Sequence, residues 1–234
     1  MPYAIITGGT QGMGKAIAEK LLSEGFSIAI SARSKDKLQA AEAEFNEKYP
    51  HASIVAFNGD MGVKEDAQAF AATVMSNFPE VDILVNNAGM FLPGTIGEEP
   101  DGLLEKMLGS NLYSAYHLTR AILPAMKTNG KGHIFNMCSI ASLRAYPNGG
   151  SYGIAKYAMM GFSENLREEL KPHNIKVTAI CPGATYTPSW YDSGVDPARM
   201  MEAKDIALML WSAYSLSTGA DVELIVLRPV KGDI

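Results

Sequence analysis

The clearest chemical potential in this sequence lies in Tyr152 and Lys156, within the stretch GGSYGIAKYAMMGF. Their four-residue spacing places both side chains on one face of a helix. A tyrosine hydroxyl with its ordinary pKa of about 10 exchanges protons poorly at neutral pH. A neighbouring ammonium favours the phenolate and lowers that pKa. The pair is therefore a candidate for proton exchange with an alcohol or a carbonyl group, although a Tyr-x-x-x-Lys spacing alone is common on helix surfaces.

A second chemical signal is the glycine-rich stretch TGGTQGMGKAIAEKL, from Thr7 to Leu21. Gly8, Gly12 and Gly14 fall between an apolar run typical of a strand and a sequence typical of a helix. Backbone without Cβ atoms allows a phosphate group to approach closely, and the helix that follows offers free N–H groups. The stretch lacks the Lys-Ser/Thr end of a nucleotide triphosphatase loop, so it favours a dinucleotide instead.

The elements that must position these residues alternate along the chain. Continuously apolar runs such as ILVNN and KVTAIC indicate strands that are covered on both faces, as in a parallel sheet. We predict strands at Tyr3–Thr7, Ser27–Ser31, Ser53–Phe57, Ile83–Asn86, His133–Cys138, Lys176–Cys181 and Glu223–Leu227. We predict helices at Met13–Ser23, Lys35–Lys48, Lys64–Asn77, Leu103–Thr128, Tyr152–Lys171 and Ala203–Tyr214. This alternation predicts an α/β protein with one doubly wound Rossmann domain over residues 1–234, a seven-stranded parallel sheet with helices on both faces.

The end of the second predicted strand indicates which dinucleotide is bound. A carboxylate there would bind the ribose hydroxyl of NAD, but the sequence reads Ile30-Ser31-Ala32-Arg33-Ser34. Arg33 presents a fork of donors suited to a 2′-phosphate, and Ser31 and Ser34 can add hydroxyl donors. Lys37, further along the chain, is a further candidate. We therefore expect NADP(H) as the cofactor.

Further polar residues fall at or near the ends of other predicted strands. Ser139 ends the strand HIFNMCS, thirteen residues before Tyr152, where its hydroxyl could hold a substrate oxygen. The run Asn86–Gly89 follows the fourth strand. Asn111 lies within a predicted helix among apolar residues. Ligands of doubly wound sheets bind at this edge, so these residues are expected to meet there.

With these motifs in order, the chain resembles the short-chain dehydrogenase/reductase family over essentially all of its 234 residues, including members similar to 3-oxoacyl reductases. The resemblance implies a catalytic set in which Tyr152 exchanges the proton and Ser139 orients the reacting oxygen. It further implies that Lys156 lowers the pKa of Tyr152 and binds the nicotinamide ribose, and that Asn111 supports a water relay.

The resemblance also implies where the cofactor binds. Asp60 and Met61 would flank the adenine, Asn87 and Gly89 would contact the adenosine ribose and cofactor backbone, and Thr187 would hold the nicotinamide carboxamide. The full expected cofactor set is Gly8, Thr10, Gln11, Gly12, Met13, Gly14, Arg33, Ser34, Asp60, Met61, Asn87, Ala88, Gly89, Tyr152, Lys156, Pro182, Gly183, Thr185 and Thr187. Members that bind NADP often carry a basic residue where this chain has Gln11, so the 2′-phosphate is expected to rely mainly on Arg33.

Composition narrows the classes of partner. The chain has a formal charge of −5 and no basic run, which argues against nucleic acid. No apolar stretch approaches the ~20 residues of a membrane span, and no secretory leader is recognisable, so we expect a cytoplasmic protein. Cys138 and Cys181 lie in apolar runs and are expected to be buried free thiols. No metal site is expected from the ligand spacing.

The sequence says less about the substrate and the assembly. One region, Pro182–Arg199, is expected to be irregular. The chain ends differently from many ketoacyl reductases, and the stretch between Thr187 and the last helix is short, so we expect either a small substrate lid or an open pocket. Expected lining residues are apolar or aromatic, which favours a ketone or aldehyde with hydrophobic bulk: Met90, Phe91, Leu92, Ala141, Leu143, Tyr146, Trp190 and Tyr191. The family resemblance implies a homo-oligomer, a dimer or tetramer. Two alternatives stay open, a non-catalytic dinucleotide sensor or scaffold and an NAD-linked alcohol dehydrogenase.

Overall fold

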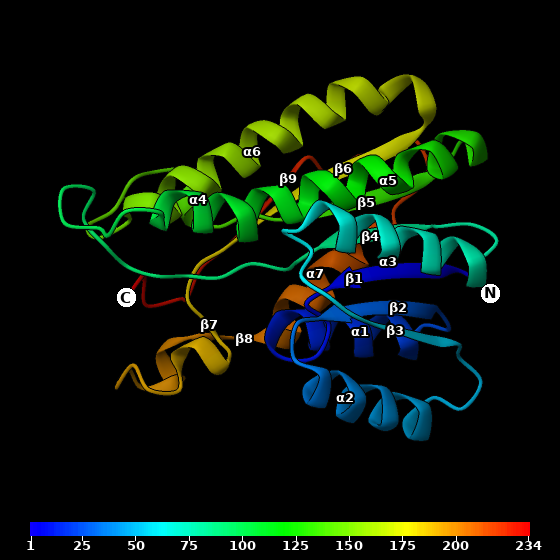
Figure 1. Ribbon diagram of the computed structural model, residues 1–234, viewed down its shortest axis with the longest axis horizontal. Coiled ribbons are helices and arrows are strands. Elements are labelled where there is room, and N and C mark those ends of the chain that lie inside the picture. The colour runs from blue at the N-terminus through cyan, green and yellow to red at the C-terminus, as the bar shows by residue number, and fades with distance from the viewer.

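A seven-stranded parallel sheet lies at the centre of the computed structural model, which describes residues 1–234 (Figure 1). The strand order is β3-β2-β1-β4-β5-β6-β9, and every neighbouring pair is parallel. The strands are β1 (Tyr3–Thr7), β2 (Ser27–Ala32), β3 (Ile54–Asn58), β4 (Ile83–Asn86), β5 (Gly132–Met137), β6 (Ile175–Pro182) and β9 (Leu224–Leu227). The predicted doubly wound fold is confirmed, and each predicted strand agrees with the observed one to within a residue at either end.

Helices cover both faces of this sheet. They are α1 (Gly12–Ser23), α2 (Lys35–Lys48), α3 (Lys64–Asn77), α4 (Leu103–Leu108), α5 (Ser114–Asn129), α6 (Gly150–Leu170) and α7 (Ala203–Tyr214). In Figure 1, α4, α5 and α6 run along one side of the sheet, and α1, α2 and α7 lie on the other.

Two apolar cores form because successive strand residues point to opposite faces. Ile6 and Ile30 pack with α1, α2 and α7, whereas Ile5 and Leu84 pack with α3, α5 and α6. These residues are fully buried, which explains why the strands are apolar without alternation. Cys138 and Cys181 are buried and free, as expected.

One helix prediction was wrong. The stretch Leu103–Thr128 is not a continuous α-helix, because residues Gly109–Tyr113 form a π-helical segment between α4 and α5. Such a segment holds more residues in its turn than an α-helix does, and it commonly occurs at functional sites. Pro124, in contrast, lies inside α5 without ending it.

The segment predicted to be irregular, Pro182–Arg199, contains local order that the sequence did not indicate. Strand β7 (Thr185–Tyr186) pairs in parallel with β8 (Met201–Glu202), directly before α7. Short 3-10 turns at Pro188–Trp190 and Pro197–Arg199 lie between the two strands. The beginning of the segment is thus paired with residues that closely follow its end.

The strand order reverses between β1 and β4, which are neighbours in the sheet. In open α/β sheets such a reversal opens a crevice beyond the carboxyl ends of the two strands, where ligands bind. The glycine stretch follows β1, and the Asn87-Ala88-Gly89 run follows β4. The fold therefore brings together two motifs that lie about eighty positions apart in the sequence.

Candidate active site

The glycine stretch forms a tight turn into α1. Gly12 has a φ angle of +56°, a conformation that suits glycine, and a Cβ atom there would lie 3.1 Å from the methyl group of Thr187. A Cβ atom on Gly14 would overlap the carbonyl oxygen of Gly8 and the side chain of Asn87. These glycines therefore allow the backbone to pack closely and leave the N-terminus of α1 open.

Thr7 and Asn87 hold this turn against β4. The hydroxyl of Thr7 accepts hydrogen bonds from the backbone N–H groups of Asn87 (2.9 Å) and Ala88 (2.8 Å). The Asn87 amide donates in return to the carbonyl oxygen of Thr7 at 2.8 Å. These hydrogen bonds thus join the carboxyl ends of β1 and β4 where the crevice lies.

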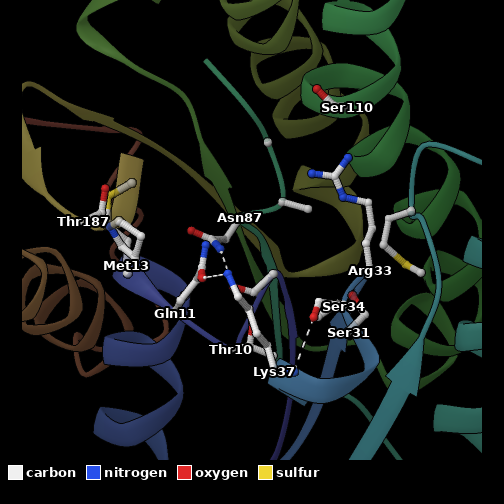
Figure 2. A pocket seen from close by; sticks show the side chains of 18 of the residues that line it. Thr10, Gln11, Met13, Ser31, Arg33, Ser34, Lys37, Asn87, Ser110 and Thr187 are labelled. Atoms are coloured by element: carbon white, nitrogen blue, oxygen red, sulfur yellow. Dashed lines mark hydrogen bonds between the residues drawn. The ribbon is translucent and has the colours of Figure 1, made fainter. Parts of the chain in front are cut away.

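A cavity of about 410 Å³ lies in this crevice (Figure 2). It is lined by Gly8, Thr10, Gln11, Gly12, Met13, Gly14, Ser31, Ala32, Arg33, Ser34, Lys37, Gly59, Asp60, Met61, Asn87, Ala88, Gly89, Ser110, Thr187, Pro188 and Ser189. Every residue that we expected around the adenosine and the phosphates is in this set. Ser110 was not anticipated, and it reaches the cavity from the π-helical segment.

Polar groups gather at the end of β2, on one side of this cavity. The Lys37 ammonium donates a hydrogen bond to the side-chain oxygen of Gln11 at 2.9 Å, and Figure 2 shows the two side chains meeting beside the glycine turn. Ser34 begins α2 and accepts from the backbone N–H of Lys37 at 3.4 Å. The hydroxyl of Ser31 is buried and has no hydrogen-bond partner. A buried hydroxyl without a partner is costly, which indicates a place for a polar ligand.

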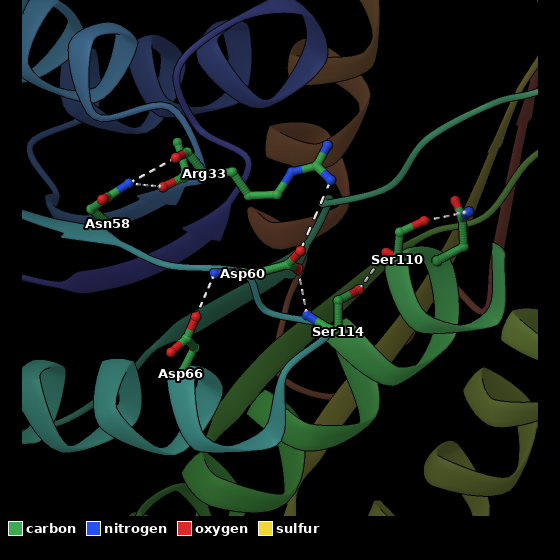
Figure 3. Close-up of polar contacts among 9 residues, drawn as sticks. Arg33, Asn58, Asp60, Asp66, Ser110 and Ser114 are labelled. Carbon is green, nitrogen blue, oxygen red and sulfur yellow. Dashed lines mark hydrogen bonds and ion pairs between the residues drawn. The ribbon is translucent and has the colours of Figure 1, made fainter. Parts of the chain in front are cut away.

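Arg33 extends from the same strand end toward β3. Its guanidinium lies 3.9 Å from the Asp60 carboxylate, as Figure 3 shows. Asp60 also accepts a hydrogen bond from the backbone N–H of Gly62 at 2.9 Å, and its own N–H donates to Asp66. The carboxylate of Asp60 is thus positioned by its own loop, while both partners of the ion pair stay solvent-accessible.

A second cavity of about 360 Å³ adjoins the first, and Met13, Asn87, Gly89, Thr187 and Ser189 line both. Its other lining residues are Met90, Phe91, Asn111, Met137, Cys138, Ser139, Ile140, Tyr146, Tyr152, Lys156, Pro182, Gly183, Ala184, Thr185, Trp190, Ser193, Asp233 and Ile234. The four residues expected to be catalytic, Asn111, Ser139, Tyr152 and Lys156, all lie in this cavity.

Tyr152 and Lys156 lie one turn apart on α6, as their spacing predicted. The Lys156 ammonium lies 5.7 Å from the centre of the Tyr152 ring and donates to the carbonyl oxygen of Met137 at 2.9 Å. Burial lowers the pKa of Lys156. Burial also raises the pKa of Tyr152, while a hydrogen bond with Ser139 acts in the opposite direction. In this structure the pKa of Tyr152 is therefore not lowered by its lysine neighbour, because desolvation dominates.

Ser139 follows β5 and begins a short 3-10 turn, Ile140–Ser142. Its hydroxyl accepts a hydrogen bond from the backbone N–H of Ala141 at 3.1 Å, and its own N–H donates to the Ser142 hydroxyl. These contacts fix the position of the Ser139 side chain. The hydroxyl hydrogen remains able to donate to a bound oxygen.

Asn111 lies in the π-helical segment and is buried. Its amide nitrogen donates to the carbonyl oxygens of Met90 (2.9 Å) and Met107 (3.1 Å), whereas its side-chain oxygen has no partner. Gly89 lies between that oxygen and the Lys156 ammonium, since a Cβ on Gly89 would be 2.6 Å from the first and 3.7 Å from the second. Because Gly89 has no side chain, a space remains between the side-chain oxygen of Asn111 and the ammonium of Lys156.

The residues expected around the nicotinamide border the second cavity from β6 onward. The backbone N–H of Gly183 donates to the carbonyl oxygen of Leu227 at 2.7 Å, and the buried Thr185 hydroxyl donates to Gly183. The Thr187 hydroxyl pairs with Ser189 at 2.8 Å. Thr187 and Ser189 line both cavities, so this pair stands at their junction.

Half of the expected substrate-lining residues line the second cavity: Met90, Phe91, Tyr146 and Trp190. Leu92, Ala141, Leu143 and Tyr191 do not line it, so these four expectations were wrong. Ile140, Ser193, Asp233 and Ile234 were missed. Asp233 pairs with Arg144, which is 89 residues away, and with Arg228, which is 5 residues away. No local pattern could indicate the first of these contacts.

No three His, Cys, Asp or Glu side chains gather as they would around a metal ion. None of the helices has the length and apolar character that crossing a membrane would require.

Comparison with known proteins places this geometry in context. Residues 2–196 match the family model described as short chain dehydrogenase. A diacetyl reductase from Staphylococcus epidermidis, described as forming (S)-acetoin, is 34% identical over 188 residues, which is 80% of this chain and 72% of the relative. A sepiapterin reductase from Chlorobaculum tepidum is 29% identical and covers 98% of this chain and 97% of its own.

Among solved structures, the L-sorbose reductase of Gluconobacter frateurii, complexed with NADPH and L-sorbose, superposes with a TM-score of 0.90. It is 29% identical to this chain, and the match covers 97% of this chain and 95% of the other. All three relatives are named as reductases. The family model spans most of the chain, and the predicted motifs meet in one crevice, so the protein belongs to the short-chain dehydrogenase/reductase family of oxidoreductases.

Proposed function

We propose that this protein transfers a hydride between NADP(H) and a carbonyl compound or the matching secondary alcohol. The observation that carries the proposal is the convergence of Asn111, Ser139, Tyr152 and Lys156 in a cavity that opens onto the glycine turn. One cavity is lined largely by polar groups and backbone, and the other contains the proton-exchanging side chains. This division suits a dinucleotide in the first and a substrate in the second.

The first cavity fits a phosphorylated dinucleotide. The N-terminus of α1 would receive the pyrophosphate beside Gly12 and Met13, where free N–H groups and the helix dipole favour an anion. Asp60 and Met61 would flank the adenine, and Asn87, Ala88 and Gly89 would border the ribose. The unpartnered hydroxyl of Ser31 supplies an additional donor at the end of β2.

Two cations favour NADP(H) over NAD(H). Arg33 is more than half exposed, and its pair with Asp60 is long, so the guanidinium can turn toward a 2′-phosphate at little cost. Lys37 is the second cation, since its contact with Gln11 holds the ammonium beside the glycine turn. Lys37 thus supplies from α2 a positive charge beside the neutral Gln11, and in this proposal the 2′-phosphate contacts two cations instead of one.

NADPH, when bound, supplies the hydride. Tyr152 is the group that gives the proton to the carbonyl oxygen, and Ser139 donates a hydrogen bond that orients that oxygen. Burial raises the pKa of Tyr152, so the hydroxyl stays protonated at neutral pH. A protonated tyrosine is the form that carbonyl reduction needs, and the three relatives named as reductases agree with that direction.

In this proposal, Lys156 and Asn111 help to return a proton to Tyr152 after it has protonated the substrate. The buried ammonium of Lys156 faces the Tyr152 ring on one side and the empty acceptor of Asn111 on the other. A water bound between Lys156 and Asn111 would satisfy the orphaned oxygen, which has no partner in the protein. Such a water would return a proton toward Tyr152 after each reduction.

The substrate is expected to carry hydrophobic bulk next to its carbonyl group. Phe91, Tyr146 and Trp190 line the second cavity, whose volume of about 360 Å³ suits a small organic molecule. Phe91 meets the Tyr152 ring edge-on, with centroids 4.9 Å apart. An apolar group would therefore lie next to the reacting carbon, close to the phenol.

We further propose that the chain forms a homodimer or homotetramer. Four large apolar or aromatic side chains are exposed on the π-helical segment, α5 and α6, namely Tyr113, Tyr116, Ile154 and Tyr157. Monomers rarely leave a large apolar surface open to water. Light scattering at several concentrations would measure the assembly, and charged substitutions at Tyr116 and Tyr157 should dissociate it.

The experiment that tests the proposed activity is a panel of apolar ketones and aldehydes, supplied with NADPH and separately with NADH, and followed by cofactor absorbance. Turnover with NADPH would support the proposal, and turnover with NADH alone would favour the NAD-linked alternative. Tight NADPH binding without any turnover would favour a sensor or scaffold.

A further inference from the structure

The helix that carries Tyr152 starts without a capping side chain of its own. Helix α6 is preceded by Gly149 and begins with Gly150, and its first turn contains no acidic residue. The first N–H groups of a helix lack partners within the helix and need an acceptor from elsewhere. The missing acceptor comes from a residue about fifty positions earlier in the chain.

That residue is Glu99, in the loop between β4 and α4. One carboxylate oxygen accepts a hydrogen bond from the backbone N–H of Ser151 at 2.9 Å, and the other accepts from the Ser151 hydroxyl. Ser151 is buried and immediately precedes Tyr152. A negative charge at this end of a 21-residue helix is also favoured by the helix dipole.

The backbone around Glu99 is shaped to admit its carboxylate. Gly150 has a φ angle of +39°, and a Cβ atom there would overlap a carboxylate oxygen of Glu99. A Cβ atom on Gly94 would lie 2.7 Å from the Glu99 side chain. The absence of side chains at Gly94 and Gly150 leaves a gap that the Glu99 carboxylate fills. Both the loop and the start of α6 are therefore shaped to accept this carboxylate.

The same loop contacts Tyr152 directly. The backbone N–H of Gly94 donates to the carbonyl oxygen of Asn148 at 3.0 Å, just before α6. A few residues earlier in the loop, Phe91 packs edge-on against the Tyr152 ring at an interplanar angle of 80°. The loop that carries Glu99 therefore contacts both the start of α6 and, through Phe91, the ring of Tyr152.

We propose that Glu99 is a positioning residue for carbonyl reduction, because it holds the first turn of α6 and thereby fixes the Tyr152 hydroxyl against Ser139. The inference rests on the proposed function. Small displacements of a proton donor slow a reaction strongly, because the reacting atoms must be held in line. Glu99 lines neither cavity, so cofactor binding is expected to be independent of it.

The test compares Glu99→Ala and Glu99→Gln with wild type, and uses Glu98→Gln as the matched control. Glu98 is exposed and accepts only from the nearby Thr95 hydroxyl. Glu99→Ala is expected to lower kcat by roughly tenfold and leave the NADPH dissociation constant within about twofold. Glu99→Gln keeps one acceptor oxygen for Ser151, so its kcat should lie between those of Glu99→Ala and wild type. The kcat of Glu98→Gln should match that of wild type.

Two further readouts separate positioning from a general loss of folded protein. The solvent isotope effect on kcat should rise in Glu99→Ala, since a misplaced Tyr152 makes proton transfer more rate-limiting. A smaller folded fraction would lower the rate and leave the isotope effect unchanged. Amide hydrogen exchange should also quicken in residues 150–153 of Glu99→Ala.

An unchanged kcat, or a lower kcat with an unchanged isotope effect, would overturn the inference. If wild type reduces no carbonyl compound, the proposed function fails instead. Hydrogen exchange then decides alone: unchanged exchange in residues 150–153 overturns the role of Glu99, and faster exchange supports its hold on the first turn.

Discussion

The guanidinium of Arg33, which follows β2, lies 3.9 Å from the carboxylate of Asp60, which follows β3 (Figure 3), and both residues line the first cavity. Both side chains are accessible to water, and exposed pairs of this kind contribute on the order of 0–1 kcal/mol. The ion pair orients the Arg33 side chain but is too weak to prevent it from moving. In the absence of a cofactor, Asp60 thus keeps the arginine close to where a 2′-phosphate would bind.

The first prediction concerns Arg33→Asp. We expect the dissociation constant of NADPH to rise by roughly 10- to 100-fold, because a charge-assisted hydrogen bond is lost and a like charge is introduced. Binding of NADH should tighten, since a carboxylate at this strand end can accept from a ribose hydroxyl. Fluorescence titration with both cofactors measures the change. Lys35→Ala removes a neighbouring cation outside the cavity and should alter neither constant; equal loss of both cofactors in Arg33→Asp would contradict the assignment.

A second prediction follows from the contact between Lys37 and Gln11. Lys37→Ala should weaken NADPH binding by about three- to tenfold and leave NADH binding unchanged, because the Lys37 ammonium beside Gln11 is proposed to contact the additional phosphate, which NADH lacks. The salt dependence of NADPH binding should also become shallower, as one cation fewer is screened. Isothermal titration at two ionic strengths provides both values. A parallel loss of NADH affinity would show that Lys37 instead supports the glycine turn.

Tyr152→Phe tests the proton donor. The substitution keeps the ring that packs against Phe91 and removes only the hydroxyl. We expect kcat for carbonyl reduction to fall by about 10²–10⁴-fold, which is the typical contribution of general acid catalysis. NADPH binding should be retained, and the circular dichroism spectrum should match wild type. Retained turnover would assign the proton donor to another group.

The fourth prediction concerns stability and pH. His133 is buried, its ring stacks on Phe135, and burial together with the charge of Lys176 lowers its pKa from the usual value of 6.5 to about 3. The unfolded chain therefore binds a proton more readily than the folded one between these two pH values. The stability due to neutral His133 is fully present above pH 6.5 and is lost as the pH falls toward 3.

This group alone should make the protein about 2 kcal/mol less stable at pH 5 than at pH 7. Urea unfolding at the two pH values measures the difference. His133→Gln removes the titrating group, so the variant should lose less stability over the same interval, whatever its stability at pH 7. Equal pH dependence in both proteins would show that other groups control acid unfolding.

Much of this arrangement could be predicted because its determinants are local in the sequence. The bounds of β1, β4, α2, α3 and α7 follow from apolar runs and polar flanks, and they agree with the structure residue for residue. The glycine turn and the Tyr152–Lys156 pair depend on spacing within one turn. Parallel strands then bring all these sites to a single edge of the sheet, so fold and site were predictable together.

The features that were missed depend on contacts between distant segments. Asp233, which lines the second cavity, pairs with Arg144, and Glu99 meets Ser151 across a loop. Neither contact leaves a periodic pattern in the sequence. The extent to which a side chain is desolvated also depends on contacts between distant segments. Burial raises the pKa of Tyr152, so the lowering that we expected from Lys156 is not observed.

The π-helical segment Gly109–Tyr113 was likewise not visible as a pattern, because one additional residue in a turn barely disturbs the apolar stripe of a long helix. Its consequence concerns the tolerance of the chain to length changes. The segment already holds one residue more than an α-helical turn, so deleting a single residue between Leu108 and Ser114 would convert it to a regular helical turn and leave α4 and α5 in register. The fold would therefore survive such a deletion, whereas the bulge that presents Ser110 and Asn111 to the two cavities would be lost.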